Sequence, residues 1–219
     1  MGLPTFLTDP AAVVVADTST VINLNATGCA LEIIRAIPNK LVVVDVAAAE
    51  LNEGRRRGRK DADLLAELVS ARIVEIVELD DSTGAHFETL VVGPAAMTLD
   101  DGEAATIAYA VTCQGTPVID ERKATRICAE RYPTLRLGCT VDILAHSAVE
   151  SYLGKEMLSN AVFNALHKGR MSVLPQHVKW VIELIGPARA EACVSLPKSV
   201  RQPQQNVSGA KGRSKNDAV

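Results

Sequence analysis

Aromatic residues and long apolar runs are both scarce in this chain. Aromatic side chains make up only 3% of the 219 residues, and Trp180 is the single tryptophan. The core must therefore come from Val, Leu, Ile and Ala. Apolar residues nevertheless reach 47% of the chain, which is enough for a sizeable buried core and argues against global disorder.

No apolar stretch reaches the roughly 20 residues that a membrane-spanning helix needs. The N-terminus, Met1-Gly2-Leu3-Pro4, lacks a basic region followed by an apolar segment, so export is not indicated. We therefore expect a cytoplasmic protein without a membrane partner.

Paired cysteines are also lacking. The five cysteines are far apart and form no C-x-x-C pair, which predicts buried, reduced thiols rather than disulfides or a zinc finger. The four histidines match no paired metal spacing, and we assign none of these nine residues to catalysis: Cys29, Cys113, Cys128, Cys139, Cys193, His86, His146, His167 and His177.

Charge is unevenly distributed. The formal net charge is −3, but residues 196–219 carry five basic side chains against Asp217, which leaves the preceding residues at −7. A nucleic-acid partner is still compatible with an acidic body, provided that cationic groups hold its phosphates locally.

Short β-branched runs alternate with helical patterns along the chain, which predicts a parallel sheet flanked by helices in a three-layer α/β fold. The expected strands cover 12–16, 41–44, 72–79, 116–119 and 135–137. We expect one α/β domain over residues 1–150, a helical extension over 151–195 packed on it, and a disordered basic tail over 196–219.

Acidic residues stand where two of these strands end. Asp17 follows the first apolar run and Asp120 a later one, while Glu50 and Glu103 lie on helices of the flanking units. Ligands bind beyond the carboxyl ends of parallel strands, and carboxylates held close together repel each other unless a cation compensates them. The pattern therefore predicts an acidic pocket for a hard divalent metal such as Mg²⁺.

Each acid also has a purely structural explanation. Asp17 can cap a helix, Glu103 can face the positive end of a helix dipole, and Glu50 can be a solvated helix residue. Asp120 can pair with a basic residue that follows it. The set, rather than any single acid, favours the metal site.

The ordered motifs Asp17-Thr18-Ser19-Thr20, Gly102-Glu103-Ala104-x-x-Ile107 and Val118-Ile119-Asp120, with Glu50 between the first two, resemble a PIN domain. They are most similar to the VapC-like toxin branch, which has a G-E-A-x-x-I motif, and the resemblance covers about residues 12–150. It implies an endoribonuclease that depends on Mg²⁺ or Mn²⁺ and is the toxin of a toxin–antitoxin pair. The implied partners are an RNA substrate, an antitoxin protein and a second copy of the chain.

The resemblance also implies residue roles. Asp17, Glu50, Glu103 and Asp120 would be the catalytic acids, and Asp17, Glu103 and Asp120 among them would bind the metal. Thr18 or Ser19 would orient Asp17 or hold a metal-bound water, and Asp142 would lie just outside the ligand set.

Three further acids leave the composition of the site open. Asp100 and Asp101 precede Gly102, and either can share the work of Glu103. Glu121 follows Asp120, but strand alternation predicts that its side chain points away from the pocket.

Two basic clusters follow proposed ligands closely and are candidates for holding RNA phosphates. A solvated charge run explains the first cluster equally simply, and an ordinary helix face is the simpler explanation of the second. They are Arg55, Arg56, Arg57, Arg59 and Lys60, and Arg122 and Lys123.

A non-catalytic RNA-binding or signalling α/β module is the alternative function. A receiver-like module would carry its acceptor aspartate after a middle strand, whereas Asp17 follows the first. A haloacid-dehalogenase-type phosphatase would need a second aspartate two residues after Asp17, where this chain has Ser19.

Overall fold

Four parallel strands form the sheet in the computed structural model, which describes Leu7 and residues 9–201. Their spatial order is β3 (Val74–Val77), β2 (Leu41–Val44), β1 (Val14–Ala16) and β4 (Thr116–Val118). Ala16 lies beside Val43 on one side and Val118 on the other. The carboxyl ends of β1, β2 and β4 are therefore level, and the residues after these strands meet at one edge of the sheet.

Helices connect and cover these strands. In chain order they are α1 (Thr18–Thr27), α2 (Ala30–Ala36), α3 (Asp45–Arg56), α4 (Asp61–Ser70), α5 (Asp81–Val91), α6 (Asp101–Cys113), α7 (Arg122–Arg131), α8 (Thr140–Leu144), α9 (Ser147–His167), the 3-10 turn η1 (Pro175–His177), α10 (Val178–Ile185), α11 (Pro187–Glu191) and α12 (Lys198–Arg201). The predicted α/β class, with a helical C-terminal extension, is confirmed.

Alternate residues of the buried strands pack against different helices. Leu41 and Val43 of β2 line a small apolar space together with residues of α1, α2 and α4. Helix α6 instead contacts β1, β2 and β4, and α5 packs against α6. All four residues of β2 are buried, as a central strand of a covered parallel sheet requires.

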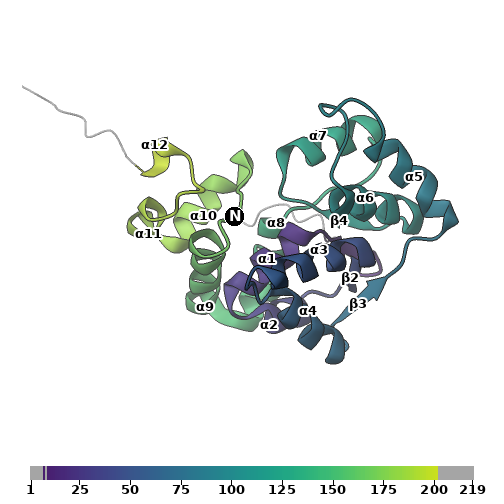
Figure 1. Cartoon of the computed structure of the whole chain (residues 1–219). Helices are drawn as coiled ribbons and strands as arrows, with labels where there is room; N and C mark the ends of the chain where they lie inside the picture. Colours follow the sequence, from purple (N-terminus) through teal and green to yellow (C-terminus); the bar gives the residue numbers. More distant parts are fainter. Residues whose placement is uncertain (1–6, 8, 202–219) are drawn as a thin grey trace, which may run out of the picture.

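The C-terminal helices α9–α12 lie on the side of the molecule away from α5–α7 (Figure 1). Helix α9 packs on α1 and α2, and its buried residues include Leu158, Val162 and Leu166. Gly154 interrupts α9 with a left-handed backbone (φ 75°). The structured chain continues beyond residue 196, because Leu196 is buried and α12 comes after it; the rest of the predicted tail, 202–219, lies outside the described residues.

The predicted strand at 135–137 is wrong. In its place the chain makes a single bridge, in which Ile119 donates to the Gly138 carbonyl (2.9 Å) and Gly138 donates to the Pro117 carbonyl (3.0 Å). A turn closed by Leu135 N–H on the Tyr132 carbonyl takes up the residues before it. Within the described ranges, no helix is long and apolar enough to cross a membrane.

Candidate metal centre

Asp17 leaves β1 and caps α1. Its Oδ1 accepts a hydrogen bond from the Thr20 backbone N–H (2.6 Å), and its Oδ2 accepts one from the Ser19 hydroxyl (2.8 Å). Asp17 is only 3% exposed. The contacts that start α1 therefore also fix a buried carboxylate at the edge of the sheet. Asp17 is both the cap of α1 and a candidate metal ligand. Of the two hydroxyls predicted to orient Asp17, Ser19 makes the contact.

Glu103 lies in the first turn of α6, and its backbone N–H donates to the capping carboxylate of Asp100 (2.9 Å). The Glu103 carboxyl group is hydrogen-bonded to that of Glu121. The predicted outward orientation of Glu121 is therefore wrong. Strand β4 ends at Val118, so strand alternation no longer governs the direction of side chains three residues later.

Glu50 projects from α3 between α1 and α6. Its Oε2 accepts a hydrogen bond from the Thr18 hydroxyl (2.5 Å), and its Oε1 accepts one from the Gly102 N–H (2.9 Å). A Cβ at position 102 would lie 2.5 Å from Glu50 Oε2. Gly102 is thus required for the close approach that holds Glu50.

Asp120 is 3% exposed and is held from two sides. Its Oδ1 accepts from the Thr140 N–H (2.8 Å), and its Oδ2 accepts from the Thr140 hydroxyl (2.5 Å) and from Asn23 Nδ2 (2.7 Å). A carboxylate offers about four acceptor sites, so these bonds leave room for a ligand at Oδ1.

Five carboxylates surround one cavity of about 300 Å³, which is lined by Asp17, Thr18, Ser19, Ile22, Glu50, Asp100, Glu103 and Glu121. None of these described lining residues is basic. A second cavity of about 470 Å³ shares Ser19, Ile22 and Glu121 with the first, and Asp120 lines it. Asp101 is exposed and lines neither cavity.

The carboxylates perturb one another strongly. Burial, followed by the charge of Asp120, raises the pKa of Asp17 to about 7. Burial, followed by the hydrogen bond to Glu121 and the charges of neighbouring acids, raises the pKa of Glu103 to about 9. Burial also raises the pKa of Asp120. The site therefore holds more negative charge than its surroundings stabilise, and a cation would relieve that charge.

A hard divalent metal fits this donor set. Mg²⁺ and Mn²⁺ prefer carboxylate oxygens, and the first cavity offers several of them without a competing cationic side chain. Asp17, Glu103 and Glu121 could hold the ion directly, with Asp120 contributing from the adjoining second cavity. Glu50 already has both carboxylate oxygens in hydrogen bonds to the protein, so it suits the border of the ligand set.

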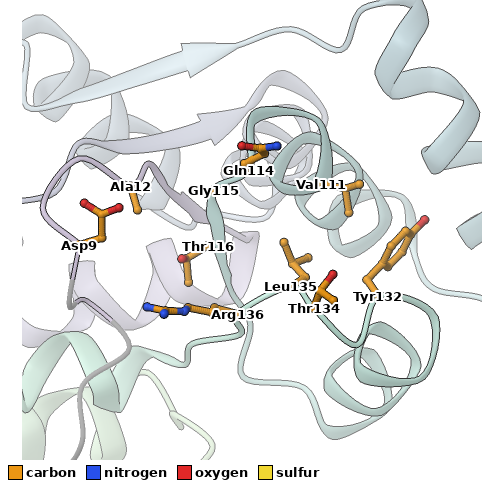
Figure 2. Close-up of a pocket in the computed structure, with 10 residues that line it drawn as sticks. All are labelled: Asp9, Ala12, Val111, Gln114, Gly115, Thr116, Tyr132, Thr134, Leu135 and Arg136. Carbon is orange, nitrogen blue, oxygen red and sulfur yellow. The ribbon is translucent and has the colours of Figure 1, made fainter.

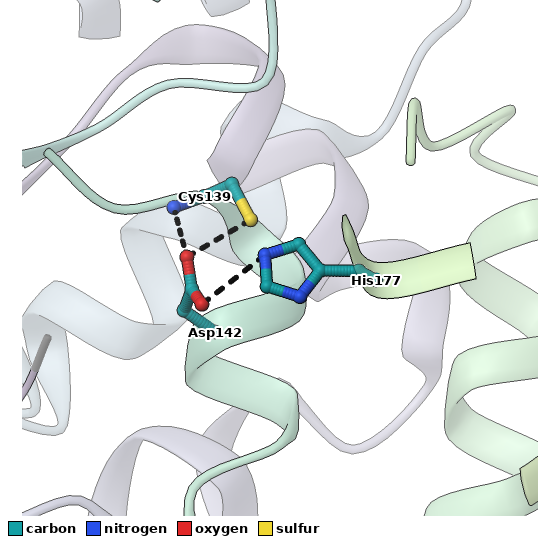
Figure 3. Close-up of side chains that lie close together, drawn as sticks. All are labelled: Cys139, Asp142 and His177. Atoms are coloured by element: carbon teal, nitrogen blue, oxygen red, sulfur yellow. Dashed lines mark hydrogen bonds and ion pairs between the residues drawn. The ribbon is translucent and has the colours of Figure 1, made fainter. Parts of the chain in front are cut away.

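Asp142 does not reach the acidic cavity. It accepts hydrogen bonds from the Cys139 N–H (2.9 Å) and thiol (3.0 Å), and its other oxygen lies 3.3 Å from His177 Nε2 (Figure 3). Burial alone would raise the pKa of Asp142, but the bonds from His177 and Cys139 outweigh it, and the pKa lies below its ordinary value. Asp142 thereby fixes the start of α8, where Thr140 holds Asp120.

The basic residues predicted to hold RNA divide into two groups. Arg59 and Arg122 line the second cavity. Arg55 is paired with Asp63 on the surface (2.9 Å). The others line neither cavity: Arg56, Arg57, Lys60 and Lys123.

Sequence reasoning missed Asn23, Thr140 and Arg170, which hold Asp120 or line the second cavity. The V-I-N-L segment after Asp17 and the threonine after Cys139 were visible signals for the first two. Nothing local marks Arg170, since it joins the site only through tertiary packing.

The largest cavity described, about 570 Å³, lies at the opposite end of the sheet (Figure 2). It is lined by Thr116, the first residue of β4, and by Ala12 ahead of β1, with Asp9 as its one acid. It is therefore separate from the acidic centre at the carboxyl ends.

Comparison with protein families agrees with this geometry. A family model described as a PIN domain matches residues 13–187. The chain belongs to the PIN domain family. PIN domains are generally nucleases that use divalent metals, and an acidic cavity at the carboxyl edge of a parallel sheet is consistent with that chemistry. Neither the curated proteins nor the solved structures gave a match.

Proposed function

We propose that this PIN domain is a metal-dependent endoribonuclease that hydrolyses RNA phosphodiester bonds with Mg²⁺ or Mn²⁺. The observation that carries the proposal is the cavity of about 300 Å³ lined by five carboxylates and, among its described lining, by no basic residue. Such a cavity repels a polyanion by itself, and a divalent cation would offset part of its charge and offer a positive centre to a phosphate.

The protein groups around the cavity have separate tasks. Asp17, Glu103 and Asp120 would hold the ion, together with Glu121, which lines the same cavity as Asp17 and Glu103. Ser19 and Thr20 orient Asp17, while Asn23 and Thr140 orient Asp120. When bound, a divalent ion would supply a more acidic water and would offset charge on the phosphate. Glu50 keeps the start of α1 and the start of α6 in register through Thr18 and Gly102.

We further propose that the protein is the toxin of a toxin–antitoxin pair, with an antitoxin protein and a second copy of the chain as partners. The G-E-A-x-x-I motif at Gly102–Ile107 supports this role.

A cleavage assay tests the activity. Purified full-length protein is incubated with mixed RNA and either Mg²⁺ or Mn²⁺, beside Asp17→Asn and Asp120→Asn. We expect cleavage by the wild type, none in EDTA, and a loss of more than about 100-fold in each variant, beyond the range seen for residues that only support a ligand.

Asp101→Asn is the matched control, because this exposed acid lines neither cavity. Equal cleavage by wild type, Asp17→Asn and Asp120→Asn would show that the acids are wrongly assigned. RNA binding without cleavage under either metal would favour the non-catalytic RNA-binding module instead.

A further inference from the structure

The second cavity contains arginines that the folded chain leaves largely uncommitted. Arg59, Arg122 and Arg170 come from the α3–α4 loop, the start of α7 and the loop after α9, yet all three line the same space. Within the described ranges, neither Arg122 nor Arg170 makes a hydrogen bond or an ion pair through its side chain. Arg59 uses its Nε on Asp61 (2.9 Å).

Arg122 and Arg170 remain unpaired although acids line the same cavity. Asp120 and Glu121 line the same cavity, but Asp120 is committed to Asn23 and Thr140, and Glu121 to Glu103. Free guanidinium groups in a recess are well suited to bind phosphate oxygens.

Gly169 explains how Arg170 reaches the cavity. A Cβ at position 169 would lie 2.7 Å from the Ala165 carbonyl oxygen and 2.9 Å from Ala26 Cβ of α1, and it would lie 3.1 Å from Asn23 Oδ1. Only glycine permits the loop to pack this tightly on α1, beside the asparagine that binds Asp120.

Arg170 itself has a left-handed backbone with φ 56°. Glycine adopts this conformation far more readily than arginine does. The backbone alone would therefore favour glycine at position 170, and the guanidinium group offers the chemical reason for arginine there.

We propose that the second cavity binds the phosphate adjacent to the scissile one in a single-stranded RNA. Arg122 and Arg170 bind this phosphate, and Arg59 lies at the rim of the cavity. This inference rests on the proposed nuclease function and specifies its substrate. The two cavities share Ser19, Ile22 and Glu121, so neighbouring phosphates of one strand can occupy both. A flexible single strand adapts to two adjoining recesses more readily than a rigid duplex does. No aromatic ring lines the described walls of either cavity, so no base can stack there. The contacts are with the RNA backbone, and binding tolerates any base.

Binding is tested in full-length Glu103→Gln protein, which keeps RNA intact. The probe is a labelled single-stranded RNA of mixed sequence, measured by fluorescence anisotropy across a range of KCl concentrations. We expect Arg122→Ala and Arg170→Ala each to weaken binding on the order of tenfold at low salt, and to reduce the slope of log Kd against log salt by about 0.7, the value for one phosphate contact on a single strand.

Arg72 supplies the matched control, since it is exposed, has a left-handed backbone with φ 56° and lines neither cavity. Glycine should raise the melting temperature at either position, because it relieves the same backbone conformation. Only Arg170→Gly should weaken RNA binding, and Arg170→Lys should restore part of it. In the cleaving protein, the arginine variants should raise KM more than they lower kcat.

The outcomes separate this inference from the nuclease proposal. If wild type cleaves RNA but Arg122→Ala and Arg170→Ala match Arg72→Ala in Kd and salt slope, the phosphate site is wrong and the nuclease stands. If RNA binds through these arginines but no divalent metal gives cleavage, the nuclease proposal fails and the binding site stands. Equal affinity for a duplex of the same sequence would overturn the assignment to single strands.

Discussion

The carboxyl groups of Glu103 and Glu121 are hydrogen-bonded to each other, although one comes from α6 and the other from the residue that precedes α7. Two carboxyl groups can share a hydrogen bond only when one of them carries a proton. In the metal-free protein, a proton therefore reduces the repulsion between Glu103 and Glu121. A bound divalent cation would reduce the same repulsion. Protons and metal should therefore compete for the same oxygens.

The first prediction concerns pH and Mg²⁺. The pKa of Asp17 rises from 3.8 to about 7 on folding, and that of Glu103 rises from 4.5 to about 9. At pH values between the unfolded and the folded pKa of each acid, the folded protein binds more protons than the unfolded chain does. The free energy of unfolding therefore falls as the pH rises through this window. Melting curves in EDTA should move to lower temperature from pH 5 to pH 9, and the stabilisation by added Mg²⁺ should grow over the same range. A Mg²⁺ effect independent of pH would argue against these two acids as ligands.

The second prediction separates stability from activity. Glu103→Gln removes an acid whose ionisation is unfavourable in the fold, and the amide can still donate to Glu121. We expect metal-free Glu103→Gln to melt about 2–4 °C higher than the wild type at pH 8, which corresponds to about 1 kcal/mol for a chain of this size, and to lose RNA cleavage. Asp101→Asn should change neither property. A lower melting temperature for Glu103→Gln would mean that the carboxylate stabilises the fold.

The third prediction concerns Gly102→Ala. The added Cβ would meet Glu50 Oε2 at 2.5 Å and Oε1 at 2.7 Å. Because these atoms end a flexible side chain, the protein should fold with Glu50 displaced rather than unfold. Cleavage should fall by about 10- to 100-fold, the range for residues that support a metal ligand. Gly84→Ala is the control, since nothing lies near the corresponding Cβ. Full activity of Gly102→Ala would show that the position of Glu50 does not matter.

The fourth prediction tests the hold on Asp120. Thr140→Val keeps the shape of the side chain and the backbone N–H bond but removes the 2.5 Å hydroxyl bond to Asp120 Oδ2. We expect a loss of about 1–2 kcal/mol in the free energy of unfolding and weaker activation by Mn²⁺. Thr112→Val, whose hydroxyl bonds only the Ala108 carbonyl of its own helix, is the comparison in a denaturant titration. Equal effects of both changes would mean that the Thr140 hydroxyl has no special role.

Much of the fold could be predicted from local sequence. The run from Leu41 to Val44 is continuously apolar and buried on both sides, and Asp17 combines a helix cap with a strand end. Glu121 could not be placed in this way, because its direction depends on where β4 ends and α7 begins. Arg170 could not be placed at all, because it reaches the cavity through the packing of Gly169 on α1, about 150 residues earlier in the chain.

Synthesis runs from the N-terminus, and domains tend to fold as they emerge. All four acids predicted from the sequence, Asp17 to Asp120, precede the first residue of α9 at Ser147. Helix α9 buries α1, and the loop after it brings Arg170 to Asn23. A ribosome-bound chain that ends before α9 thus contains Arg59, Arg122 and all four predicted acids but lacks Arg170. If the proposed phosphate site is correct, such a chain would bind RNA more weakly than the finished protein.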